Sequence, residues 1–407
     1  MTKCKNKIAV MIAWPREINV YEYLFKKKYA SIFDFIVNDT KSFEKGRNKT
    51  NLLIQEILKK KNIKFKLFSK VFKKYKYKAL ISTGEINALK INFYSIVKFL
   101  YANTIGIFIK FTKIDKILIN IFGRPFTGGS TDYKKIGTNW YPEKEIANKV
   151  IKYPDGADLK LKNYPYKFYE NIFDIFFSFS ELDLSLVKKK FNNIICKKID
   201  YFRYKKKLTF KKKKKFISNF NFISKKPLIV WLPTHIETPL EEDRNIIDWI
   251  KKISNLQKRF NLIIRPHPKT LSRSGSIIKT LESNNLKIDQ EFDRNLGNLI
   301  NSADLILADY GGMVFDSIYL KKRVVLLNMF QDSKYVSELK LSDSIDIKFR
   351  KKFICINLNH SQKIFEKKIS NAFSSAYKKQ IRNIRNIVFG ESKKINLVQM
   401  ISFLKNL

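Results

Sequence analysis

Cysteine and histidine are scarce in this chain, with three of each among 407 residues. The cysteines are Cys4, Cys196 and Cys355, which stand apart with no pair at the spacing of a metal site or a redox motif. An odd set of isolated cysteines excludes a disulfide framework and a zinc site, and it indicates a reduced, cytosolic setting. We therefore predict a protein without a bound metal or cofactor.

Acidic residues are also few, at 36 against 81 lysines and arginines, which gives a formal net charge of +45. The lysines are spread over the whole length, beside abundant Ile, Asn, Phe and Tyr, as an AT-rich genome tends to encode. Much of the positive charge therefore reflects codon usage. The positive charge that this does not explain favours anionic partners such as nucleotide diphosphates, phosphate-bearing polymers or acidic lipids. No recognisable DNA- or RNA-binding motif is present, so we expect no nucleic-acid partner.

Long apolar runs are missing as well. The most apolar stretch, residues 93–111, is broken by Lys98, Asn103 and Lys110 and falls short of a membrane-spanning helix. No small-residue cleavage site follows the short apolar run near the N-terminus, so secretion is not expected. The basic, aromatic-rich stretch 59–78 is either a membrane-surface segment or a solvated helix or loop. We expect a cytoplasmic protein, with or without peripheral contact at the inner face of the cell membrane.

Strands alternate with helices throughout the second half of the chain. This order predicts a parallel sheet covered on both faces, as in a Rossmann-type domain. The expected strands are 228–233, 261–266, 305–309 and 323–328, and the expected helices are 241–260, 276–284, 295–303 and 313–321. The first half alternates less cleanly, but strand candidates at 7–14, 33–39 and 77–83, and a strand followed by a helix at 172–191, predict a second α/β domain.

The length of the chain predicts two domains. A run of five lysines interrupts the periodicity between them and reads as a solvated linker. Two facing Rossmann-type domains leave a cleft, and ligands of such sheets bind beyond the carboxyl ends of the strands. The predicted units are an N-terminal acceptor-side domain at 1–205, the linker at 206–227, a nucleotide-diphosphate-binding domain at 228–385 and a C-terminal helix within 386–407.

Three predicted strand ends carry polar residues. Thr234 and His235 follow the first strand of the second half, and Arg265 and His267 follow the next in the sequence RPHP. Two of the three histidines thus come directly after strands, although each could also be a satisfied structural histidine. The third strand end is the sequence DYGG at 309–312.

Gly311 and Gly312 stand side by side at the start of a predicted helix, in a chain with only 13 glycines. Without a Cβ, the backbone can turn sharply and bring its amides close to a ligand. The unpaired amides and the positive dipole end of the helix favour a diphosphate. The plainer alternative is a tight turn without a ligand. Asp316, one turn into the helix, either accepts hydrogen bonds from ribose hydroxyls or is an ordinary acid on the helix face.

Together these segments resemble the C-terminal half of the CDP-glycerol:poly(glycerophosphate) glycerophosphotransferases of teichoic-acid synthesis. That family has a strand ending in A-P-T, a strand ending in R-x-H-P and a D-Y-S-S-x-x-F-D segment. The two serines are replaced here by Gly311 and Gly312, a pair that also resembles the S-G-G segment of the UDP-N-acetylglucosamine 2-epimerases. Both families imply a GT-B architecture. The family residues retained are Pro233, Thr234, Arg265, His267, Pro268, Asp309, Tyr310, Phe315 and Asp316.

A looser resemblance lies in the first half, where YPDGADLK at 153–160 stands in place of the family's W-H-G-T-x-x-K. Gly156 and Lys160 fall at the family's spacing, and Asp155 falls where the family has a histidine that is the expected base for the acceptor hydroxyl. An aspartate needs burial or a neighbouring carboxylate to serve as a base near neutral pH, and Asp158 is close enough in sequence to be that neighbour. Alternatively, Asp155 is a turn residue of the common P-D-G sequence.

The resemblance implies a transferase for surface-polymer synthesis. Its donor is nucleotide-diphosphate linked, with the phosphates over the glycine pair and contacted by Arg265 and His267. The acceptor is a polymer or lipid-linked hydroxyl, deprotonated by Asp155, and the scheme requires no metal. The alternative is a nucleotide-sugar-dependent GT-B enzyme, either a glycosyltransferase or an isomerase like the UDP-N-acetylglucosamine 2-epimerases.

Overall fold

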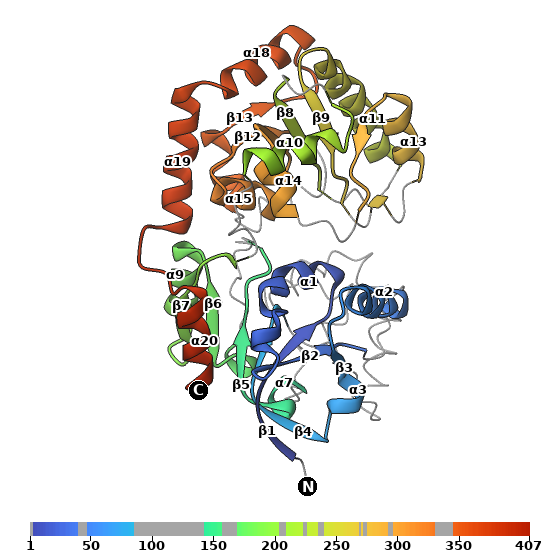
Figure 1. Cartoon of the computed structure of the whole chain (residues 1–407). Coiled ribbons are helices and arrows are strands. Elements are labelled where there is room, and N and C mark those ends of the chain that lie inside the picture. Colours follow the sequence, from blue (N-terminus) through green and yellow to red (C-terminus); the bar gives the residue numbers. More distant parts are fainter. Residues whose placement is uncertain are drawn as a thin grey trace, which may run out of the picture.

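The computed structural model of the protein has two lobes, which Figure 1 shows one above the other. The structure describes residues 3–39, 47–84, 142–156, 169–202, 209–222, 226–234, 240–267, 270–271, 275–291, 296–329 and 345–407. The stretch 93–111, Asp158, Lys160, His235 and Pro268 lie outside these residues. Among the described residues, no helix combines the length and the apolar character needed to cross a membrane.

The N-terminal lobe is built on a parallel sheet, to which the described residues contribute seven strands. In spatial order they are β3 (Phe65–Leu67), β2 (Phe33–Val37), β1 (Lys3–Ile12), β4 (Tyr75–Ser82), β5 (Ala147–Lys152), β6 (Ile175–Ser178) and β7 (Ile195–Lys198). Its helices are α1 (Pro15–Tyr21), α2 (Arg47–Lys60), α3 (Phe68–Val71), α7 (Pro142–Ile146), α8 (Tyr169–Ile172) and α9 (Glu181–Lys190).

The C-terminal lobe has a second parallel sheet, with six strands in the described part of the chain. Their order is β10 (Lys287–Ile288), β9 (Asn261–Ile264), β8 (Leu228–Leu232), β11 (Leu305–Ala308), β12 (Arg323–Leu327) and β13 (Ile354–Ile356). The helices are α10 (Phe210–Ser218), α11 (Leu240–Ser254), α13 (Gly275–Ser283), α14 (Leu296–Ser302), α15 (Gly312–Tyr319), α17 (Ile345–Lys348), α18 (Gln362–Ala372) and α19 (Ser375–Phe389). The strands and helices predicted for this half are confirmed to within a few residues.

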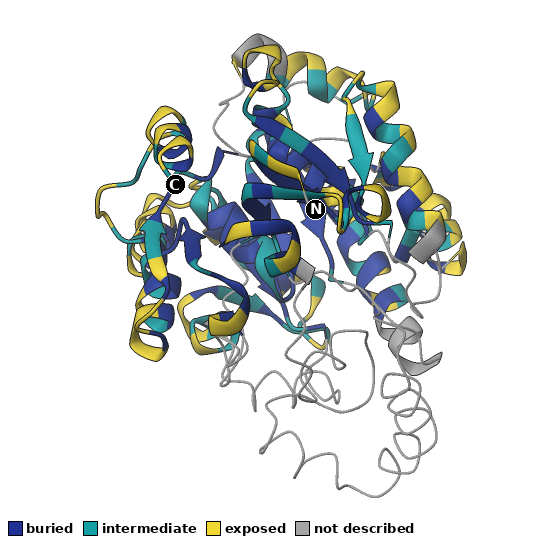
Figure 2. Ribbon diagram, turned by 90° about the horizontal axis from the view of Figure 1, so that it is seen from below, coloured by how far each residue is buried: buried dark blue, intermediate teal, exposed yellow. Residues whose placement is uncertain are grey.

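The central strands of both sheets are buried on both faces, as Figure 2 shows by the dark strands among helices whose outer faces are exposed. In β1, Ile8 and Val10 belong to the apolar cluster on one side of the sheet, while Ala9 and Met11 belong to the cluster on the other. Successive side chains of a strand point to opposite faces. An unbroken apolar run is therefore what a parallel strand between two helical layers requires.

The chain crosses between the lobes more than once. After α19 it returns to the N-terminal lobe, where α20 (Leu397–Lys405) packs Met400 and Leu404 into the core of that lobe. Figure 1 shows this return in red along one side of the molecule. The predicted C-terminal helix is thus present, but the sequence did not show that it would pack on the first domain rather than on the second.

Four aromatic side chains meet where the lobes join, and we call them the hinge aromatics: Phe179, Tyr201, Tyr319 and Phe389. The rings of Phe179 and Tyr201 stack with their centroids 3.8 Å apart. The amide of Tyr201 donates to the hydroxyl oxygen of Tyr319 at 3.2 Å. Tyr319 ends α15, so this helix of the C-terminal lobe reaches the junction directly.

The lysine run predicted as a solvated linker contains a helix, α10. Phe216 and Ile217 pack against the core of the C-terminal lobe, and Lys213 forms an ion pair with Asp304 at 2.7 Å. The long methylene stems of lysines tolerate such a position because the ammonium groups stay in water. The lysine run is thus not solvated on all sides, because two apolar residues anchor one face of this helix to the core.

The basic stretch 59–78 is neither a solvated helix nor a loop as a whole. It includes the end of α2 and then forms β3, α3 and the first half of β4, with Phe68, Val71 and Tyr77 buried. Its Lys66 surrounds Asp34 together with Lys5 and Lys7, and the hydroxyl of Tyr77 donates to the same carboxylate at 3.1 Å. Burial alone would raise the pKa of Asp34, but the hydrogen bonds from Lys66 and Lys7 outweigh it and lower the pKa to about 2.

The folded protein should therefore lose stability when acid protonates Asp34. Because its pKa is depressed on folding, the stabilisation is present above the ordinary value of 3.8 and is lost as the pH falls toward about 2. In urea unfolding at several pH values, Asp34→Asn should cost about 1 kcal/mol at pH 7 after solvent screening and should flatten this acid-dependent loss. Asp39→Asn, which alters a carboxylate bonded to Ser69, is the control. Equal acid sensitivity in wild type and Asp34→Asn would refute the assignment.

Candidate active site

The predicted strand ends of the C-terminal lobe come together at one edge of its sheet. Strands β9, β8, β11 and β12 are neighbours and parallel, so their carboxyl ends lie side by side. This edge presents Thr234 after β8, Arg265 and His267 after β9, and the DYGG turn after β11. Sequence reasoning thus brought together residues from three separated segments. We call this edge, with the first turn of α15, the donor edge, after the donor-binding role that the sequence predicts for it.

Asp309 is the structural centre of the donor edge and is fully buried. Its carboxylate accepts hydrogen bonds from the amide of Thr234 at 2.9 and 3.0 Å, from the Thr234 hydroxyl at 2.7 Å and from the Tyr310 amide at 2.8 Å. Burial raises the pKa of Asp309, and the hydrogen bonds from Thr234 oppose that rise. Asp309 and Thr234 therefore tie the ends of β8 and β11 to each other.

The glycine pair forms the turn into α15. Gly311 has φ +85° and ψ −165°, a conformation that residues with a Cβ rarely adopt, and its amide donates to the carboxylate of Asp346 at 2.8 Å. Gly312 begins the helix, and a Cβ added there would meet nothing within 4 Å. The sharp turn expected from the sequence is thus needed at Gly311, whereas Gly312 leaves open space at the start of the helix.

The other predicted donor residues are held by protein contacts. Arg265 pairs with Asp289 through Nη1 at 2.7 Å, and both side chains are almost wholly buried. His267 is half-buried, and its carbonyl oxygen accepts from the Leu271 amide at 3.1 Å. Asp316 is fully buried within α15, so its carboxylate is not at the surface in this structure. The donor roles of these three residues stay predictions.

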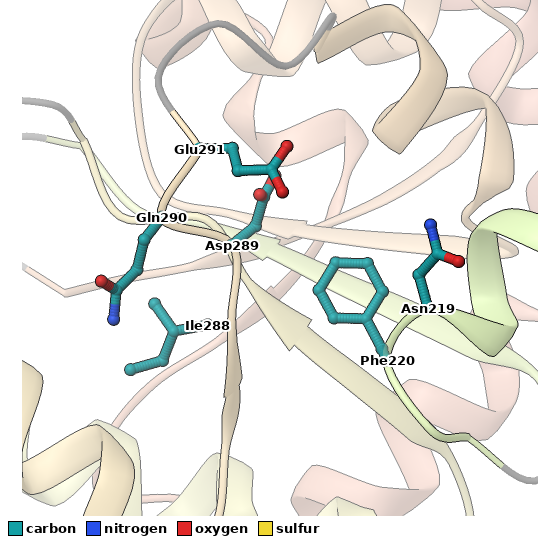
Figure 3. Close-up of a pocket in the computed structure, with 6 residues that line it drawn as sticks. All are labelled: Asn219, Phe220, Ile288, Asp289, Gln290 and Glu291. Carbon is teal, nitrogen blue, oxygen red and sulfur yellow. The ribbon is translucent and has the colours of Figure 1, made fainter.

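A cavity of about 490 Å³ adjoins the donor edge at the end of β10. Figure 3 shows it between the segment that follows β10 and the turn that follows α10. Asp289, the partner of Arg265, stands in its wall. Its lining residues are Asn219, Phe220, Ile288, Asp289, Gln290 and Glu291, none of which the sequence singled out.

On the N-terminal lobe, Asp155 follows β5 at the side that faces the hinge. Its carboxylate pairs with Arg16 of α1 at 2.7 Å, and its carbonyl oxygen accepts from the hydroxyl of Tyr201 at 3.2 Å. The expected partner, Asp158, lies outside the described residues. A guanidinium favours the ionised form of a carboxylate, which is the form that can accept a proton, but it also weakens that carboxylate as a base.

Glu17 is a buried carboxyl beside this point that sequence reasoning missed. It accepts from the amides of Ala13 and Trp14 at 2.6 and 3.2 Å and from the Thr83 hydroxyl. Burial is the main reason that its pKa is raised, and the charge of Asp155 raises it further. Glu17 thereby joins the ends of β1 and β4. A glutamate three residues after the helix N-cap was the available signal, because that spacing is typical of a capping box.

No group of three or more histidine, cysteine or acidic side chains that could hold a metal ion is found within the described part of the chain. The polar groups gathered at the donor edge and beside the hinge are backbone amides, an arginine, a histidine and carboxylates.

Comparison with known proteins identifies the C-terminal lobe. The model of the CDP-Glycerol:Poly(glycerophosphate) glycerophosphotransferase family matches residues 199–341. The C-terminal lobe therefore resembles this family over the matched residues. The match contains the whole donor edge, and the resemblance predicted from the sequence is confirmed, as is the assignment to the transferases. Asp155, Asp158 and Lys160 lie outside the match, so their roles stay predictions.

The whole chain also resembles solved structures. The wall teichoic acid polymerase TagF aligns with a TM-score of 0.55 at 12% identity, over 98% of this chain and 87% of that one. A UDP-N-acetylglucosamine 2-epimerase aligns with a TM-score of 0.51 at 12% identity, over 94% and 91%. At this identity the likeness concerns the fold alone, and it confirms the predicted GT-B-like pair of Rossmann-type domains. No curated protein matches the glycerophosphotransferase-like chain in sequence.

The two glycines of the donor edge should respond differently to substitution. Gly311→Ala forces a side chain into the φ +85° conformation and should destabilise the protein by about 1–3 kcal/mol, although the nearest neighbour, Thr234 Cγ2, is 3.8 Å away. Gly312→Ala meets open space and should change stability by less than about 0.5 kcal/mol. Thermal and urea unfolding of the two variants decide the point. Equal losses would show that the turn at Gly311 is not constrained.

Proposed function

We propose that this protein transfers glycerophosphate from CDP-glycerol to a hydroxyl of a surface polymer. The carrying observation is that one family match contains Thr234, Arg265, His267 and the DYGG turn, and that the fold gathers all of them at one edge of a sheet. The family description itself names CDP-glycerol and poly(glycerophosphate).

In the proposed reaction an acceptor hydroxyl attacks the phosphorus that carries the glycerol. A new phosphorus–oxygen bond forms, the bond to the other phosphate of the donor breaks, and CMP leaves. The first amides of α15 lack partners within the helix and stabilise negative charge on the phosphates. His267 and Arg265 lie after the adjacent strand β9 and offset the charge that develops on the leaving CMP.

Asp155 is proposed to accept the proton of the acceptor hydroxyl. Support comes from its place after a strand of the other lobe and from its tether to the hinge through Tyr201. Its carboxylate is held in place by the ion pair with Arg16 at 2.7 Å. The acceptor therefore belongs on the N-terminal lobe and the donor on the C-terminal lobe.

Loss of the carboxylate should separate transfer from donor binding. Asp155→Asn should lower the rate of transfer by about 100-fold or more, as expected for a lost general base, while CDP-glycerol binds as in wild type. Release of CMP in the presence of acceptor measures the rate, and calorimetry measures binding. Glu170→Gln, at an exposed position of α8 on the same lobe, is the control and should keep at least half of the rate. An undiminished rate in Asp155→Asn would leave the residue as a turn former.

A donor panel tests the function as a whole. CDP-glycerol should raise the unfolding temperature in a concentration-dependent way. Glycerol phosphate, which lacks the nucleotide, and UDP-N-acetylglucosamine should not raise it. Incubation with CDP-glycerol and polymer should then release CMP and lengthen the polymer. Stabilisation by UDP-N-acetylglucosamine alone would overturn the proposal and favour the nucleotide-sugar alternative.

That alternative, a glycosyltransferase or an epimerase-like isomerase, is favoured by one observation. The glycine pair replaces the two serines of the family motif, and a UDP-N-acetylglucosamine 2-epimerase shares the fold. Analysis of the products separates a transferase from an isomerase, because an isomerase forms its product without an acceptor.

Peripheral contact with a membrane is proposed for the surface formed by stretch 59–78. Six of its lysines are exposed, and such charges are attracted to anionic lipid headgroups. Equal binding to neutral and anionic vesicles would exclude this contact. The exposed lysines are Lys59, Lys60, Lys64, Lys70, Lys73 and Lys74.

A further inference from the structure

A segment that follows the family match contacts the DYGG turn at two points. Asp346 of α17 accepts the hydrogen bond of the Gly311 amide at 2.8 Å. Arg350, two residues after α17, donates through Nη1 to the carbonyl oxygen of Asp309 at 2.7 Å. Asp346 is 3% exposed, so its charge sits inside the protein rather than in solvent. The turn is thus held at an amide and at a carbonyl by one short segment.

Arg350 also binds the neighbouring strand end. Its Nη2 donates to the carbonyl oxygen of Leu327 at 2.8 Å, and its Nε donates to Oδ1 of Asn328 at 2.6 Å. The guanidinium lies 4.2 Å from the centroid of the Tyr310 ring. A planar guanidinium can donate in several directions at once, which a lysine ammonium on a flexible stem cannot reproduce at the same three acceptors. Arg350 therefore joins the ends of β11 and β12 beneath the turn.

These contacts have a consequence for an incoming diphosphate. The Gly311 amide is engaged by a carboxylate, so the amides at the start of α15 that lack a partner within the helix are those of Gly312 and Met313. A glycine at positive φ is held in one conformation only by its surroundings, since its own backbone allows many. Preformed amide donors bind an anion more tightly because less ordering is needed on binding.

We propose that Asp346 and Arg350 are positioning residues of the donor edge. Asp346 fixes Gly311 by its amide, Arg350 fixes Asp309 by its carbonyl, and the phosphates are received by Gly312 and Met313. The inference rests on the proposed function, because it takes CDP-glycerol as the ligand. It adds two residues beyond the matched range 199–341 to the set that determines donor affinity.

Calorimetry with CDP-glycerol on the full chain tests this assignment. Asp346→Ala and Arg350→Ala should each weaken binding by about tenfold, and in turnover they should raise KM while leaving kcat within about twofold. Asp346→Asn should restore most of the affinity, because an amide oxygen can still accept from Gly311. Arg350→Lys should not restore it. Asp346→Ala removes none of the Arg350 hydrogen bonds described above. This variant therefore tests the proposal even if Arg350→Ala does not fold.

Arg385 provides the matched control at the other end of α15. Its Nε donates to the carbonyl oxygen of Tyr319 at 3.3 Å, and its guanidinium lies 5.6 Å from that ring. Arg385→Ala should lower the unfolding temperature less than Arg350→Ala, because it removes fewer hydrogen bonds, and should leave the affinity for CDP-glycerol unchanged. Equal losses of affinity in both variants would reduce Arg350 to a general stabiliser and overturn the inference.

Asp346→Ala has its own contrary outcome. If this variant binds CDP-glycerol more tightly than wild type, Asp346 competes with the phosphates for the Gly311 amide, and the positioning role is wrong. If wild type itself does not bind CDP-glycerol, the proposed function fails first. The two failures are therefore distinguishable in the same experiment.

Discussion

The hydrogen bonds to the buried Asp309 carboxylate hold the donor edge together. A buried charge is tolerated only when its oxygens are hydrogen-bonded, and Asp309 finds its donors at Thr234 and Tyr310. These contacts join the end of β8 to the end of β11, two strands that are neighbours in space but more than 70 residues apart in the chain. These hydrogen bonds also set the position of the glycine turn, because Gly311 comes two residues after Asp309.

The same helix that begins at the glycine turn ends at the junction of the lobes. α15 runs from Gly312 to Tyr319, and the hydroxyl oxygen of Tyr319 accepts from the amide of Tyr201. The hydroxyl of Tyr201 in turn donates to the carbonyl oxygen of Asp155. A short series of contacts therefore connects the donor edge with the proposed base on the other lobe. Because α15 is packed at both ends, it can hold the glycine turn and the junction of the lobes at a fixed distance from each other.

The strand ends that form the donor edge could be located in the sequence because their signals were local. An apolar run followed by a polar residue marks a strand end, and parallel neighbours bring such ends to one edge. Asp346, Arg350 and Arg16 gave no comparable signal, because their partners lie far away in the sequence and no local pattern marks such a contact. The helix α10 was missed for a related reason: its five lysines masked the two apolar side chains, Phe216 and Ile217, that attach it to the core.

The sequence by itself determined the alternation of strands and helices in two α/β domains and the residues at three strand ends. These follow from periodicity and backbone preference, which act over a few neighbours along the chain. The tertiary structure alone decided that Asp346 takes the Gly311 amide, that Arg265 pairs with Asp289 and that α20 returns to the first lobe. Such contacts join residues far apart in sequence, and only the packing of whole elements selects one partner among many of the same charge.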